Sequence, residues 1–139
     1  MTRFLLMVNY DNGQVPEPMA EMTTWDPADI KAHMAYYEAL NSELRESGEL
    51  IGGERLAWPE MSRIVRSDGI SAPVVTDGPY AEAKEQIAGY QMIDVESLGR
   101  AIEIAARISA VPGPGGVPIQ QPIEVRQVME DDDDIGLEV

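Results

Sequence analysis

The sequence predicts an α+β fold in which two helices cover one face of an antiparallel sheet. Helical periodicity occupies about residues 27–47 and 98–108, and shorter extended segments precede, separate and follow these two regions. The predicted order is β-α-β-β-β-α-β, which matches a split βαβ, ferredoxin-like sandwich. Because several extended segments are apolar on both faces, a second subunit placed sheet against sheet is also expected, which makes the predicted protein a homodimer.

The chain of 139 residues is long enough for one domain with a real core. We expect residues 1–129 to form this domain and residues 130–139 to be an acidic, disordered tail. The tail begins with the run EDDDD, whose like charges repel one another and favour a solvated state. A solubilising end is the favoured interpretation of the tail, and a partner-binding segment is the alternative.

Charge and composition exclude several classes of function. The net charge of −15 argues against binding to nucleic acid or to an anionic membrane, since both need a basic surface. The chain has no cysteine, so disulfides and thiol chemistry are excluded, and its single histidine makes a transition-metal site unlikely to form. We therefore expect no metal and no cofactor. The first apolar run, RFLLMVNY, is too short to span a membrane, and we expect a cytoplasmic protein.

The elements of the first half have clear boundaries. A strand at residues 3–10 should carry apolar side chains on both faces, and a loop rich in Pro, Asp and Gly should follow it at residues 11–26. Asp26 is expected to cap the first helix and Pro27 to occupy its first position. Gly48 is expected to end the helix.

The second half alternates short strands and turns. Strands are predicted at residues 50–58, with a bulge at Gly52 and Gly53, and at 61–66, 73–76 and 86–94. Ser97 should cap a second helix with an apolar stripe made of Leu98, Ala101, Ile102, Ala105 and Ile108. The last strand is predicted at residues 119–128, where Pro122 favours an edge or end position.

His33, the only histidine, is predicted to lie on the apolar stripe of the first helix. At about 100° per residue it falls among Ile30, Met34, Tyr37, Leu40 and Leu44, so its imidazole should face the sheet. One interpretation is a core histidine that bonds a backbone carbonyl or a tyrosine hydroxyl. The other is a titratable group placed in a cleft between helix and sheet, where it would suit acid–base chemistry.

The segment TDGPYAEAKEQIAGY, residues 76–90, concentrates charge between two predicted strands. Asp77 should lie at a strand end, and Pro79 should open a short helical turn with Glu82 in its first turn. The segment has no glycine-rich phosphate loop and is net acidic, so phosphate is a poor ligand for it. A plain solvated turn is the alternative interpretation.

The residues DGPYAEAKEQIAGYQMIDVESLGRAIEIAAR resemble the signature of the YCII-related superfamily, in its DGPF-domain branch. The segments RFLLMVNYD, HMAYYEALNSELRESGELIGGERL and PIEVRQV are similar to that family as well. Tyr80 stands where the branch has Phe, and Ala83 stands where it has Thr, so any role of that hydroxyl is absent here. The resemblance covers most of residues 1–129 and is most specific at residues 77–90.

The resemblance implies a ferredoxin-like dimeric α+β barrel. It also implies an active-site pair, because a His on the first helix and an Asp near the third strand have been proposed as one in relatives; His33 and Asp77 are the matching positions. Proteins of the DGPF branch are also encoded beside extracytoplasmic-function sigma factors, which suggests a regulatory alternative. No established reaction or substrate comes with the family.

Three functional hypotheses follow. The first is small-molecule binding or acid–base catalysis of the isomerase, lyase or hydrolase type, in which Asp77 orients His33 and His33 moves a proton. Tyrosine hydroxyls would contact the substrate and a basic side chain would hold an anionic group; the candidate binding residues are Tyr37, Arg55, Tyr80, Glu82, Lys84 and Tyr90. The second is a non-catalytic partner of a regulatory protein. The third is a structural dimer whose charged segment only closes the barrel.

Overall fold

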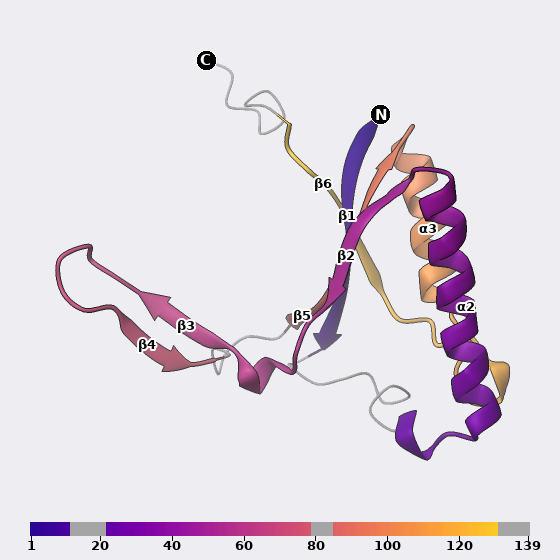
Figure 1. Cartoon of the computed structure of the whole chain (residues 1–139), viewed down its shortest axis with the longest axis horizontal. Helices are drawn as coiled ribbons and strands as arrows, with labels where there is room; N and C mark the ends of the chain where they lie inside the picture. The colour runs from indigo at the N-terminus through magenta and orange to yellow at the C-terminus, as the bar shows by residue number, and fades with distance from the viewer. Residues whose placement is uncertain (12–21, 79–84, 131–139) are drawn as a thin grey trace.

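A computed structural model describes residues 1–11, 22–78 and 85–130 and shows two layers (Figure 1). The main sheet has four antiparallel strands in the order β2-β5-β1-β6. Its strands are β1 (Thr2–Asp11), β2 (Leu50–Arg55), β5 (Glu85–Val95) and β6 (Ile123–Gln127). The helices α2 (Pro27–Glu46) and α3 (Leu98–Ser109) lie side by side on one face of this sheet. The arrangement is the ferredoxin-like α+β fold that the sequence predicts.

Four strands lie between the two helices, one in each of the four segments predicted there, whereas the predicted order β-α-β-β-β-α-β counts three. Two of these strands, β3 (Arg63–Arg66) and β4 (Val74–Asp77), form a separate two-stranded sheet. They pair as a hairpin, which we call the arm. A short 3-10 helix, η2 (Pro59–Met61), connects β2 to the arm. The arm extends away from the body on the side of the sheet that the helices leave uncovered (Figure 1).

The glycine pair in β2 makes the predicted bulge. The register between β2 and β5 shifts between Leu50 and Gly52. At Gly53, a Cβ atom would lie 2.6 Å from the carbonyl oxygen of Tyr90, closer than any side chain can approach. β2 therefore needs glycine there to stay paired with β5. At the opposite edge, β6 begins just after Pro122 and pairs only with β1, as expected for a strand that proline limits.

Both helices begin at the predicted caps. The side chain of Asp26 accepts a hydrogen bond from the Ala28 N–H at 2.9 Å, and Pro27 occupies the first turn. Ser97 caps α3 by accepting from the Arg100 N–H at 3.1 Å. α2 ends at Glu46, and Gly48 follows with a φ of 82°, the left-handed conformation that glycine favours.

The apolar stripe predicted for α3 was wrong in two positions. Leu98 and Ile102 are exposed, whereas Ile104 is fully buried together with Ala101 and Ala105. Measured around the helix axis, Ala101, Ile104, Ala105 and Ile108 form a narrower stripe, and the two rejected residues lie at its margin. In α2, Leu40 and Leu44 enter the core as predicted, but Met34 is exposed.

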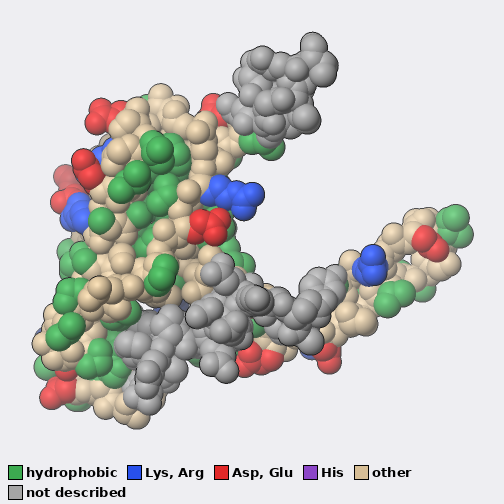
Figure 2. Space-filling model, turned by 180° about the vertical axis from the view of Figure 1, so that it is seen from behind, with side chains coloured by type: hydrophobic (Ala, Val, Ile, Leu, Met, Phe, Trp, Pro, Cys, Tyr) green, Lys and Arg blue, Asp and Glu red, His purple; other side chains and the backbone are tan. Residues whose placement is uncertain are grey.

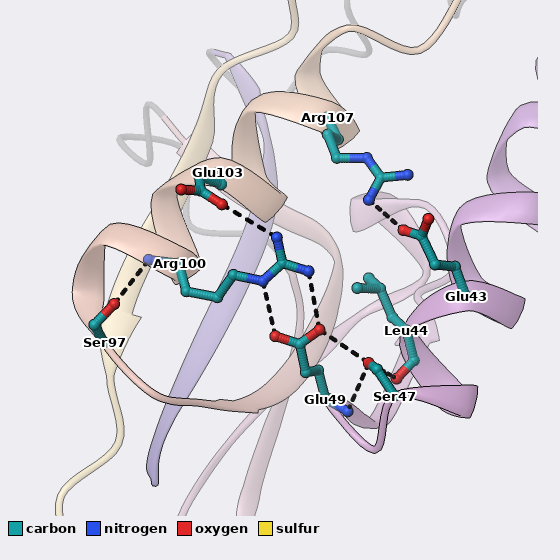
Figure 3. A network of polar contacts seen from close by, with 8 residues as sticks. All are labelled: Glu43, Leu44, Ser47, Glu49, Ser97, Arg100, Glu103 and Arg107. Atoms are coloured by element: carbon teal, nitrogen blue, oxygen red, sulfur yellow. Dashed lines mark hydrogen bonds and ion pairs between the residues drawn. The ribbon is translucent and has the colours of Figure 1, made fainter.

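A polar network ties the ends of the two helices together (Figure 3). Arg100 of α3 donates two hydrogen bonds to the carboxylate of Glu49, at 2.8 and 2.9 Å, and a third to Glu103 at 3.1 Å. Arg107, two turns further along α3, pairs with Glu43 of α2. The Arg100 hydrogen bonds hold the pKa of Glu49 below its ordinary value, and Glu49 in turn raises the pKa of Arg100.

Candidate functional site

His33 is buried, as the helical stripe predicts, and it bonds a backbone carbonyl. Its side chain is 3% exposed, and Nδ1 lies 2.9 Å from the carbonyl oxygen of Pro112, in the segment that follows α3. A carbonyl oxygen only accepts hydrogen bonds, so Nδ1 carries the proton that is donated to it. In the neutral ring, Nε2 is then the nitrogen with a free lone pair. The contact thus fixes both the orientation of the imidazole and its tautomer.

Two aromatic rings enclose His33. The Trp25 ring lies 5.5 Å away and the Tyr37 ring 5.2 Å away, measured between centroids, and both meet the imidazole edge to face. Burial, and to a lesser extent the neighbouring Tyr36, raises the pKa of Tyr37 above its ordinary value. Its hydroxyl therefore stays protonated and able to donate at neutral pH. Tyr37, one of the predicted substrate-binding residues, contacts His33.

Asp77 lies in a different part of the single chain. It ends β4, as predicted, and its side chain is 86% exposed. Its ion-pair partner is Arg63, with 3.4 Å between Nε and Oδ1, directly across the base of the arm. The contacts of His33 come from α2 and the Pro112 segment, so the structure of one chain does not bring the two side chains together. The proposed His33–Asp77 pair stays a prediction.

The glycine after Asp77 has a local steric role. The Gly78 N–H donates to the Ser62 carbonyl at 2.9 Å, and a Cβ on Gly78 would overlap the Ser62 hydroxyl. That hydroxyl is held in place because it donates to the Pro59 carbonyl at 2.6 Å. The first two residues of the Asp-Gly-Pro motif therefore join the two strands at the base of the arm. Asp77 does so through its ion pair with Arg63, and Gly78 through its hydrogen bond to Ser62.

Of the remaining predicted binding residues, Tyr90 and Arg55 do not lie together. Tyr90 is half-buried and pairs with Met7 and Glu54, which places it on the sheet face away from the helices. Arg55 pairs with Gly89 and projects to the opposite face, the side on which α2 and His33 lie. Tyr80, Glu82 and Lys84, together with the helical turn predicted from Pro79, lie outside the described residues.

Sequence reasoning missed a hollow at the base of the arm. Its volume is about 250 Å³, and its lining is mainly apolar: Leu56, Ala57, Trp58, Pro59, Met61, Ser62, Gln86 and Ile87. The sequence assigns Trp58 to the end of the strand predicted at 50–58 and Met61 to the start of the one predicted at 61–66. The structure instead places both in the connection formed by η2, where they are exposed.

Within residues 1–11, 22–78 and 85–130, no cluster of three or more His, Asp or Glu side chains is arranged to hold a metal ion. None of the helices described there is both long and apolar enough to cross a membrane.

The fold and this site define a small ferredoxin-like α+β protein with one buried histidine and a projecting hairpin. Residues 2–126 match the model of the YCII-related domain, so the chain belongs to the YCII-related family. It is also similar to an uncharacterised protein of Rhizobium meliloti (strain 1021). The two are 29% identical over 99 residues, which cover 70% of this chain and 79% of the relative.

Proposed function

We propose that the protein is a homodimer that binds a small anionic molecule beside His33 and moves a proton on it. The observation that carries this proposal is the bond from Nδ1 to the Pro112 carbonyl. It leaves Nε2 as the nitrogen that accepts or returns a proton, which is the arrangement a general acid–base catalyst needs. The Pro112 carbonyl would then orient the imidazole of His33, which is the role that the sequence predicts for Asp77.

The anionic character of the ligand rests on Arg55. Asn41 of α2 accepts a 2.6 Å hydrogen bond from the side chain of Gln91 in β5. The row of the sheet formed by Gln91 and its cross-strand partner Gly53 therefore lies beneath this part of α2. Gly89 and Arg55 occupy the next row on the same face, toward the end of α2 that carries His33 and Tyr37. A guanidinium on that side favours a carboxylate-bearing ligand. The Tyr37 hydroxyl, kept protonated by burial, would supply a hydrogen-bond donor.

The homodimer rests on the uncovered face of the sheet. Leu5, Met7, Tyr90 and Met92 stand on that face in two adjacent strands and are only half-buried. Apolar side chains gathered on one face of a sheet are stabilised when a second layer of protein covers them. Sheet-against-sheet pairing of two chains would supply that layer with a self-complementary contact.

The single histidine makes the test direct, because its imidazole signals in an NMR spectrum have only one source. We would titrate the protein with a panel of small mono- and dicarboxylates, using phosphate for comparison, and follow those signals. The proposal predicts a saturable shift of the imidazole signals with at least one carboxylate, which Arg55→Gln weakens. Absence of any such shift across the panel would contradict the proposed site.

Proton transfer needs a separate readout. Carbonyl compounds among the bound carboxylates should exchange their α-protons with deuterated solvent faster in the presence of the protein. The variant His33→Asn retains an N–H at the position of Nδ1 but has no Nε2, so it should abolish the exchange while the fold persists. Exchange at the wild-type rate in His33→Asn would show that His33 is not the catalytic base.

A further inference from the structure

We propose that the arm is a dimerisation device: the β3–β4 hairpin of one chain packs against the body of a second copy. This inference extends the proposed homodimer, on which it rests, because it adds a second interface beyond the facing sheets. The arm exposes several apolar side chains, among them Val65, Ile70 and Val74.

Few contacts within the chain stabilise the arm. Four residue pairs join its strands, and none of its residues belongs to the core. Val65 and Val75 face each other across the hairpin and are 61% and 56% exposed, and Ile70 at the tip is 93% exposed. An isolated two-stranded hairpin is marginally stable in water. Its apolar side chains therefore need a surface outside the chain.

The direction of the arm places it where a second copy would lie. The arm extends on the side of the sheet opposite to α2 and α3 (Figure 1). Figure 2 shows it projecting from one end of the body, with hydrophobic side chains along its length and open space between it and the uncovered face. If two chains meet sheet against sheet about a two-fold axis, each arm must pass alongside the other chain's body.

Charge favours a second copy over another kind of partner. The chain has a net charge of −15, yet residues 63–77 of the arm contain two Arg and two Asp and are neutral. The uncovered sheet face carries both signs as well: Arg3 and Asp94 are paired in register, Arg126 lies 3.8 Å from Glu124, and Glu54 is paired with Tyr90. Surfaces that carry both signs are self-complementary, whereas a basic protein partner would require an acidic surface. The arm and this face therefore carry little of the acidic excess of the chain.

An apolar path connects the two surfaces. Ile51, in the bulge of β2, and Leu56, just beyond the strand, are both exposed, and so are Trp58 and Met61 at the base of the arm. These side chains run from the sheet edge through the hollow to the hairpin. A partner chain that covers the sheet face would therefore also close the mouth of the hollow.

The experiment compares two sets of variants by sedimentation velocity over a range of protein concentrations. Val65→Thr with Val75→Thr removes apolar surface from the arm but keeps the β-branched shape that its strands need. Ile102→Thr, at an exposed apolar position of α3 on the helix side of the sheet, is the control. Met7→Gln tests the sheet face independently. We expect the arm variant to raise the dimer dissociation constant about tenfold or more, and Ile102→Thr to leave it unchanged.

The outcomes separate the two interfaces. Weaker dimers in both the arm and the Met7 variants support the inference and the facing-sheet dimer together. A weaker dimer in Met7→Gln alone overturns the arm inference and leaves the homodimer standing. A weaker dimer in the arm variant alone supports the arm and overturns the facing sheets. A wild-type chain that is monomeric at all concentrations overturns both.

Amide hydrogen exchange provides a check that does not depend on any substitution. In the dimer, the amides of residues 63–66 and 74–77 should be protected, and their protection should fall on dilution together with the dimer fraction. Exchange of these amides at the same rate in monomer and dimer would overturn the inference.

Discussion

His33 and Asp77 occupy opposite environments in the single chain. The imidazole is buried against two rings and bonded to the Pro112 carbonyl, whereas the carboxylate is exposed and paired with Arg63. Replacement of His33 by Phe should lower the free energy of unfolding by about 1–3 kcal/mol, because it leaves a buried carbonyl without a donor. His33→Asn retains a donor and should cost less. Chemical denaturation measures both, and an equal loss in the two variants would contradict the assigned role of Nδ1.

Gly78 is a second residue with a specific steric task. Gly78→Ala should disrupt the base of the arm, since the added methyl group overlaps the Ser62 hydroxyl. The expected result is faster exchange of the residue-78 amide, which in the wild type donates to the Ser62 carbonyl. Removing the hydroxyl as well, in Gly78→Ala with Ser62→Ala, should restore part of the protection. No rescue in the double variant would show that the clash is not the cause.

At the scale of the elements, the Glu49–Arg100 pair joins α3 to the residue that precedes β2. Because Arg100 lowers the pKa of Glu49 in the folded state, the pair stabilises the protein above the unfolded pKa of glutamate, about 4.3. That stabilisation is lost as the pH falls through the lower, folded pKa. We expect Glu49→Gln to cost about 1–2 kcal/mol at pH 7, since the pair is bidentate and only partly exposed.

The difference between this variant and the wild type should shrink as the pH falls below the unfolded pKa of glutamate, about 4.3, toward the lower folded pKa of Glu49, because protonation of Glu49 removes the charged pair from the wild type too. Urea unfolding at a series of pH values measures this difference. A matched control is Glu103→Gln, because Glu103 makes a single, more exposed contact with Arg100. A Glu49→Gln difference that is constant between pH 3 and pH 7 would contradict the assignment.

Local signals predicted most elements and their limits. Asp26, Pro27, Ser97 and Gly48 cap or end the helices as expected, since each acts through its own backbone and immediate neighbours. The separation of the arm from the sheet was not predictable, because it depends on which strands pair across long stretches of chain. The burial of His33 followed from helical spacing, but its acceptor, Pro112, is 79 residues away, and no local pattern identifies it.

For the whole molecule, the proposed dimer would have to form against electrostatic repulsion. Each chain carries a net charge of −15, so two chains repel at low ionic strength and should associate more tightly as salt screens the charge. A chain that ends at residue 130 loses four Asp and one Glu, which reduces the net charge to −10, and its salt dependence should be weaker. Sedimentation between about 0.01 M and 0.3 M salt tests this. A dimer that weakens as salt rises would contradict it.

The central claim is that His33 holds its proton on Nδ1 and presents Nε2 for chemistry. Nitrogen-15 NMR of the imidazole tests this most directly, because the chain has one histidine and the two tautomers have distinct nitrogen shifts. We expect the proton that bonds Pro112 to lie on Nδ1, with Nε2 as the nitrogen whose shift responds when a carboxylate binds. A ring protonated at Nε2, with Nδ1 as the acceptor, would contradict both the Pro112 contact and the function built on it.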